Sequence, residues 1–149
     1  VMKVPPEFGV DDAALDEMVV PNDLRSVQEP EQRIMADLAR HGYDSDTAFA
    51  VKLALEEAIT NAVKHGNGND PAKKVTVRYY VDPDRTVIMV RDEGNGFCPG
   101  EVPDPTTEEN LERPNGRGIM LMQCYMTQVR FNETGNEVWL YKERRRRRT

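Results

Sequence analysis

The chain has 149 residues, of which 38% are hydrophobic and 31% are charged, and its net charge is −6. This length predicts one domain with its own core and is too short for two. No stretch approaches the roughly 18 uninterrupted apolar residues of a membrane helix, and residues 1–10 lack the apolar core of a signal peptide. Cys98 and Cys124 form neither a disulfide framework nor a metal-ligand spacing. We therefore expect a cytoplasmic protein without a membrane partner.

Charge is distributed unevenly along the chain. Residues 144–148 are five consecutive arginines, and without them the net charge of −6 becomes −11. An acidic body repels phosphate over most of its surface, so direct binding of nucleic acid is not expected. Residues 144–149 are interpreted as a basic, disordered tail, and the alternative is that the tail contacts an acidic protein or RNA.

The first half of the chain predicts an arm, a strand and two helices. Residues 1–15 mix proline and glycine with acidic residues and predict an irregular arm. Asp16–Val20 is a candidate strand. Apolar residues at helical spacing predict helices over Val27–Arg40 and from Ser45 or Asp46 to His65, and a glycine follows the end of each.

The second half predicts two hairpins, a loop and a third helix. The ranges are a hairpin of Val75–Val81 with Thr86–Val90, a long mobile loop over Cys98–Asn115, a helix over Arg117–Met126, and strands over Val129–Asn132 and Glu137–Lys142. This order predicts an α+β fold over residues 16–143. Its two layers are helices and a mostly antiparallel, mixed sheet.

The second predicted helix carries a polar stripe opposite its apolar face. At about 100° per residue, Glu57, Asn61 and Lys64 cluster on one side with His65 beside them. A carboxylate and a carboxamide one turn apart supply a proton acceptor and an oxygen ligand for Mg²⁺, and the lysine adds a charge for phosphate. The alternative is the solvated face of an ordinary amphipathic helix.

A glycine-rich loop follows the strand that ends near Val90. Asp92 precedes Gly94 and Gly96, and glycines at this spacing let the backbone turn sharply or approach a ligand. A buried aspartate accepts a hydrogen bond from the exocyclic amine of adenine but repels the carbonyl oxygen of guanine. The alternative is a tight turn with a solvated aspartate. Neither a dinucleotide-binding fingerprint nor a Walker loop is present.

A second glycine pair, Gly116 and Gly118, opens the last predicted helix. Backbone N–H groups and the positive end of the helix dipole favour an anion at such a position. The long loop before it could close as a lid. A plain connector is the alternative interpretation.

Together these three segments resemble the GHKL family of ATPases (gyrase, chaperone and histidine-kinase type), whose domain has the Bergerat fold. The matching boxes are Glu57–Gly66, Asp92–Phe97 and Asn115–Ile119. Their order and spacing carry the resemblance, which covers about Asp16 to Lys142. Because large extra domains and a phospho-accepting helical hairpin are lacking, the chain looks like the stand-alone anti-sigma-factor serine kinases of bacterial partner switching.

The resemblance implies a role for each matching residue. Asn61 would hold Mg²⁺, and Glu57 would act as general base toward a serine or threonine hydroxyl. The remaining residues would bind ATP: Lys64, His65, Asp92, Gly94, Gly96, Gly116 and Gly118, with Arg113 or Arg117 neutralising the transferred phosphoryl group.

The resemblance also implies partners, namely a sigma factor and an antagonist protein that is phosphorylated, and a homodimer formed through the sheet and the first helix. One departure concerns Gly135–Trp139, which replaces the usual small or threonine-rich segment, so an adenine contact there stays open. The alternative function is an ATP-binding module that sequesters a partner without phosphotransfer.

Overall fold

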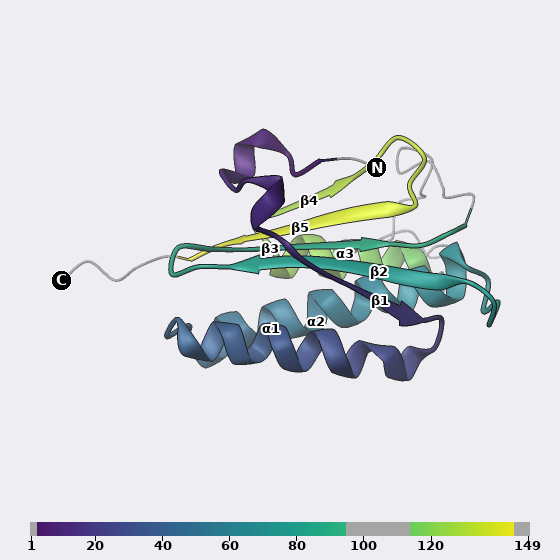
Figure 1. Ribbon diagram of the computed structural model, residues 1–149, viewed down its shortest axis with the longest axis horizontal. Helices are drawn as coiled ribbons and strands as arrows, with labels where there is room; N and C mark the ends of the chain where they lie inside the picture. The colour runs from purple at the N-terminus through teal and green to yellow at the C-terminus, as the bar shows by residue number, and fades with distance from the viewer. Residues whose placement is uncertain (1–2, 95–113, 145–149) are drawn as a thin grey trace.

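The protein forms two layers, with helices on one face of a twisted sheet (Figure 1). The structure is a computed structural model that describes residues 3–94 and 114–144, with the side chains of the second range described from Met120 onward. Its elements are β1 (Asp16–Pro21), α1 (Gln28–Arg40), α2 (Ser45–Asn61), β2 (Lys74–Val81), β3 (Arg85–Arg91), α3 (Pro114–Tyr125), β4 (Gln128–Phe131) and β5 (Glu137–Glu143).

The five strands lie in the order β1-β2-β3-β5-β4. Each neighbouring pair is antiparallel, with Val77 opposite Val90 and Ile88 opposite Leu140. The predicted two-layer α+β fold is therefore confirmed. The described strands contain no parallel pair of the kind that a mixed sheet would include.

The main core lies between the sheet and the three helices. The apolar residues of α1 and α2 recur at helical spacing and therefore lie on the face of each helix that packs on the sheet. Four of them are fully buried there: Ile34 and Leu38 of α1, and Val51 and Leu55 of α2. Alternate strand residues meet them, among them Val75, Val77, Ile88 and Val90. This packing fixes the end of α2 against the end of β3, where the predicted site residues lie.

Residues 3–15 cover the other face of the sheet (Figure 1). They form two short 3-10 turns, Pro6–Phe8 and Asp12–Ala14. Phe8 is fully buried and stacks on Tyr141 with the ring centroids 4.7 Å apart. It belongs to a second apolar cluster that also contains Val4, Val87, Met89, Trp139 and Tyr141. The segment expected to be an irregular arm is thus packed on the sheet.

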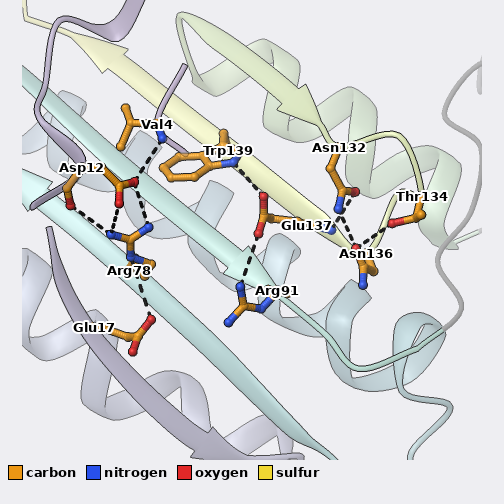
Figure 2. Close-up of polar contacts among 10 residues, drawn as sticks. All are labelled: Val4, Asp12, Glu17, Arg78, Arg91, Asn132, Thr134, Asn136, Glu137 and Trp139. Carbon is orange, nitrogen blue, oxygen red and sulfur yellow. Dashed lines mark hydrogen bonds and ion pairs between the residues drawn. The ribbon is translucent and has the colours of Figure 1, made fainter. Parts of the chain in front are cut away.

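Polar contacts hold this arm in place (Figure 2). The guanidinium of Arg78 donates to both carboxylate oxygens of Asp12 at 3.0 and 3.1 Å and to its carbonyl oxygen at 2.9 Å. Asp12 also accepts the backbone N–H of Val4 at 3.1 Å. Arg85 donates to the carbonyl oxygen of Phe8 at 3.1 Å. The arm is therefore attached by both apolar burial and charge-assisted hydrogen bonds.

Arg144, the first residue of the predicted basic tail, is held by the turn between α1 and α2. Its guanidinium donates to the carbonyl oxygens of His41 at 2.7 Å and Gly42 at 2.6 Å and lies 4.8 Å from the ring centre of Tyr43. The remaining tail residues lie outside the described range. Within that range, no helix has both the length and the apolar content needed to cross a membrane.

Candidate functional site

The last turns of α2 form one wall of the site. The predicted core face is confirmed, since Ala58, Ile59 and Ala62 are buried. The helix was expected to run to His65, but regular α-helix ends at Asn61 and a widened π turn follows over Ala62–Gly66. Such turns often occur at functional sites because they displace side chains from the regular helical spacing.

A pocket opens between the end of α2 and the sheet. Asn61, His65 and Gly66 line it from the helix side, and Asp92 lines it from the end of β3. Met122 and the β4–β5 hairpin complete the wall, the hairpin with Phe131, Gly135, Asn136, Glu137 and Val138. The amide of Asn61 and the carboxylate of Asp92 therefore belong to one pocket, although they are far apart in the sequence.

Asp92 is a buried acidic residue of this pocket. It is 9% exposed, and burial raises its pKa to about 6, although the Gly94 N–H and the charge of Lys73 act in the opposite direction. Its carboxylate accepts the Gly94 N–H at 2.8 Å, and its own N–H donates to the carbonyl oxygen of Asn136 at 2.9 Å. The predicted alternative, a solvated aspartate in a plain turn, does not match this burial.

Two glycines allow the walls of the pocket to touch. A Cβ atom on Gly66 would overlap the carboxylate of Asp92, and one on Gly94 would overlap the carbonyl group of Gly66. The closeness of backbone and carboxylate therefore requires glycine at both positions.

The hairpin residue Asn136 was not assigned a role by sequence reasoning. Its side-chain oxygen accepts hydrogen bonds from Asn132 Nδ2 at 2.6 Å and from Thr134 Oγ1 at 2.8 Å (Figure 2). These bonds orient the amide, so its nitrogen is the donor left to face other groups. The position was visible in the sequence only as a departure from the family pattern.

On the outer face of the sheet, buried polar side chains join β3 and β5 behind the pocket (Figure 2). Glu137 is 1% exposed, and its carboxylate accepts Trp139 Nε1 at 3.1 Å and lies 3.6 Å from Arg91 Nη1. Because Arg91 precedes Asp92, these contacts steady the strand end that carries the pocket carboxylate. Trp139 packs in the outer cluster, as expected of a sheet residue.

The other predicted site residues are placed differently. Glu57 is half-buried on α2 one turn before Asn61, and Lys64 is exposed; neither lines the pocket. Gly116, Arg117 and Gly118 lie in the first turns of α3, which begins at Pro114. Gly96, Arg113 and most of the predicted lid lie outside the described residues.

The side chains that line the pocket can be compared with the ligands that the predicted Mg²⁺ would need. Asn61 offers a carboxamide oxygen at the edge of the pocket, and Mg²⁺ accepts such hard ligands beside phosphate oxygens and water. Among the described residues, no group of three or more His, Cys, Asp or Glu side chains is arranged to hold a metal ion.

A helical layer on an antiparallel sheet, with a pocket between the end of α2 and the sheet that Asn61 and Asp92 line, defines a GHKL-type domain. Sequence comparison agrees with the fold, because the model of the histidine kinase-like ATPase domain matches residues 20–142. The chain belongs to this family. The arm that covers the outer face of the sheet precedes the matched range.

Curated relatives extend the comparison. The serine-protein kinase RsbW of Bacillus subtilis (strain 168) is 34% identical over 113 residues, 70% of this chain and 69% of that protein. RsbW of Bacillus licheniformis is 34% identical over 100 residues, 62% of this chain and 61% of that protein. The anti-sigma F factor of Geobacillus stearothermophilus is 33% identical over 99 residues, 64% of this chain and 67% of that protein.

Proposed function

We propose that the protein is an ATP-dependent protein serine/threonine kinase that acts as an anti-sigma factor. It would bind a sigma factor and phosphorylate a serine or threonine of an antagonist protein. The names of the curated relatives support both halves of this proposal. The observation that carries it is the shared pocket of Asn61 and Asp92. A cytoplasmic location and a homodimer belong to the same proposal.

Asp92 would select the nucleotide. An ionised carboxylate accepts a hydrogen bond from the amino group of adenine, whereas it would face the carbonyl oxygen of guanine. Asn136 lines the same pocket, and its amide nitrogen, oriented by Asn132 and Thr134, would be a second group toward the base, as a donor. With the carboxylate opposite the exocyclic group at C6 and the donor opposite N1, this pair complements adenine, whereas guanine in the same orientation would present its carbonyl oxygen to the carboxylate. ATP is therefore favoured over GTP.

The triphosphate would extend toward the end of α2. The oxygen of Asn61 would bind Mg²⁺, which would neutralise charge on the phosphates. Exposed Lys64 and His65 would lie near the same end of the helix, and the N–H groups at the start of α3 suit phosphate oxygens. Gly96 and Arg113 would also contact the nucleotide, a role that rests on the family resemblance alone.

Glu57 would act on the protein substrate. It lies one helical turn before Asn61, at half-buried depth. In the transfer, the substrate hydroxyl oxygen bonds to the γ-phosphorus, the bond from that phosphorus to the β–γ bridging oxygen breaks, and Glu57 accepts the hydroxyl proton. The products are a phosphoserine or phosphothreonine and ADP.

The test combines the purified chain, Mg-ATP labelled at the γ-phosphate and a candidate antagonist carrying an acceptor serine. We expect Glu57→Ala to keep the affinity for ATP while transfer falls by at least about 100-fold, the usual contribution of a general base. Glu56→Ala is the matched control on the same helix and should retain transfer. A fully active Glu57→Ala protein would remove Glu57 from the mechanism.

The same assay separates the kinase from the module that only sequesters a partner. Tight ATP binding without any labelled antagonist would favour sequestration. Glu57 one turn from Asn61 supports the kinase, because a module that only binds has no use for a positioned carboxylate.

A further inference from the structure

A buried asparagine joins the two walls of the pocket. Asn67 follows the π turn, is 2% exposed, and donates its backbone N–H to the carbonyl oxygen of Ala62 at 2.8 Å. It lies beside Gly66, whose Cα faces the carboxylate of Asp92. A fully buried amide needs several partners, since each unpaired polar group costs free energy.

The side chain of Asn67 finds these partners in three other segments. Its Oδ1 accepts the backbone N–H of Glu93 at 2.7 Å. Its Nδ2 donates to the carbonyl oxygen of Lys74 at 3.0 Å and to Oδ1 of Asn22 at 3.0 Å. Because an N–H only donates and a carbonyl only accepts, Glu93 and Lys74 fix which way the amide points.

Two further bonds close the network. The carboxylate of Glu93 accepts the N–H of Lys74 at 3.1 Å, so Asn67, Lys74 and Glu93 are each bonded to the other two. Asn22 also donates its Nδ2 to the carbonyl oxygen of Asp70 at 2.9 Å. The end of α2 is thus tied to the segments around β1 and β2 and to the loop after β3.

This network sets the position of Asp92. The N–H of Asp92 is held by Asn136 on one side, and the N–H of its neighbour Glu93 is held by Asn67 on the other. The carboxylate between them also contacts Gly66 and Gly94, which leave no room for a Cβ atom. A hydrogen bond weakens steeply when its acceptor moves off line, so small shifts of this loop alter what the carboxylate can bind.

We propose that Asn67 is a positioning residue for base selection, which holds Asp92 in place by clamping the backbone of Glu93 to the end of α2. The inference rests on the proposed function, since it assumes that Asp92 reads the base. Asn67 is not among the residues that line the pocket. Its effect passes through one hydrogen bond, from the Glu93 N–H to Oδ1.

The experiment measures dissociation constants for Mg-ATP and Mg-GTP by titration calorimetry, well below each variant's melting temperature. Asn67→Ala removes the acceptor for Glu93. Asn22→Ala is the stability control, because it damages the network and leaves the bond to Glu93 in place.

We expect Asn67→Ala to lower the ratio of the GTP to the ATP dissociation constant by about tenfold, the equivalent of one lost, well-made hydrogen bond. Asn22→Ala should stay within about threefold of the parent ratio despite a lower melting temperature. If Asn67→Ala does not fold, Asn67→Ser, which is too short to reach both Lys74 and Glu93, takes its place.

Unchanged selectivity in Asn67→Ala, or an equal loss in Asn22→Ala, would overturn the proposal, because Asn67 would then only stabilise the fold. Failure of the underlying function has a different signature. In that case the parent protein binds no ATP, does not prefer it over GTP, or keeps its preference in Asp92→Asn.

Discussion

Burial of the Asp92 carboxyl costs free energy, and the same burial places that carboxyl where it can bind a base. The carboxyl is buried between the N–H of Gly94 and the Cα of Gly66. Burial raises its pKa to about 6, so the carboxylate is ionised at neutral pH but protonated in mildly acidic solution. The ionised carboxylate has only acceptor oxygens for the amino group of adenine, whereas protonation turns one of them into a donor.

ATP affinity should therefore fall as the pH drops through about 6, the pKa of Asp92 in the free protein. At pH 5 about one molecule in ten keeps the ionised carboxyl, so the apparent dissociation constant should rise about tenfold over its value at pH 7.5. Titration calorimetry across this range provides the measurement. An affinity that is flat between these values would contradict the role of Asp92.

The contrast between Asp92 and Asn67 indicates what sequence reasoning can find at this scale. Asp92 stands directly after a predicted strand and before two glycines, so its setting was visible in neighbouring residues. The partners of Asn67 are Asn22, Lys74 and Glu93, which come from three distant segments. No local sequence pattern predicts these hydrogen bonds, because they depend on how the helices and strands pack.

At the scale of elements, apolar spacing predicted the helices and strands well. The cores of α1, α2 and all five strands lie within the expected ranges. The end of α2 was missed because the Asn67 N–H bonds to Ala62, five residues back, and a 3.6-residue period does not foresee that widening. The start of α3 was placed too late, because its first five residues, Pro114 to Gly118, include a proline and two glycines, which are poor helix formers.

The contact between α1 and α2 contains a carboxyl pair that the patterns did not reveal. Burial and the neighbouring carboxyl of Glu56 raise the pKa of Glu31 to about 7, against the opposing charge of Lys52. The folded protein thus binds a proton here more tightly than the unfolded chain does.

Stability should respond to pH through this pair. Between pH 4.5, near the unfolded pKa, and about 7, the folded state holds more protons, so the free energy of unfolding falls as the pH rises. Glu31→Gln keeps the shape and removes the titration. Urea unfolding at pH 5.5 and 8 should show the loss in the parent and a smaller loss in the variant; equal losses would exclude Glu31 as the source.

At the scale of the whole molecule, the two faces of the sheet have separate tasks. The helical face carries the pocket, and the opposite face is covered by residues 3–15 (Figure 1). Sequence reasoning treated these residues as irregular because they contain no periodic pattern. Their order comes from Phe8, Asp12 and the arginines that bind them, a long-range arrangement that composition does not express.

Shortening the buried side chain of Phe8 tests whether the arm on the outer face stabilises the fold without affecting the pocket. Phe8→Ala should lower the free energy of unfolding by about 3 kcal/mol, the usual cost of removing a buried phenylalanine ring. Glu7→Ala, which affects only a partly exposed ion pair with Arg130, should cost less than about 1 kcal/mol. Urea unfolding gives both values, and ATP affinity should be unchanged in either variant. Similar losses in the two variants would show that Phe8 does not anchor the arm.

The covered face also constrains self-assembly. Trp139, Met89 and Tyr141 would be a ready surface for a second subunit in a bare domain, but in this chain they are already in contact with Phe8 and Val4. Any dimer built on that face has to displace its own chain first, so its apparent dissociation constant includes the free energy of lifting those residues away. Dimer formation and release of residues 3–15 from the sheet would then be coupled, and both would increase with protein concentration.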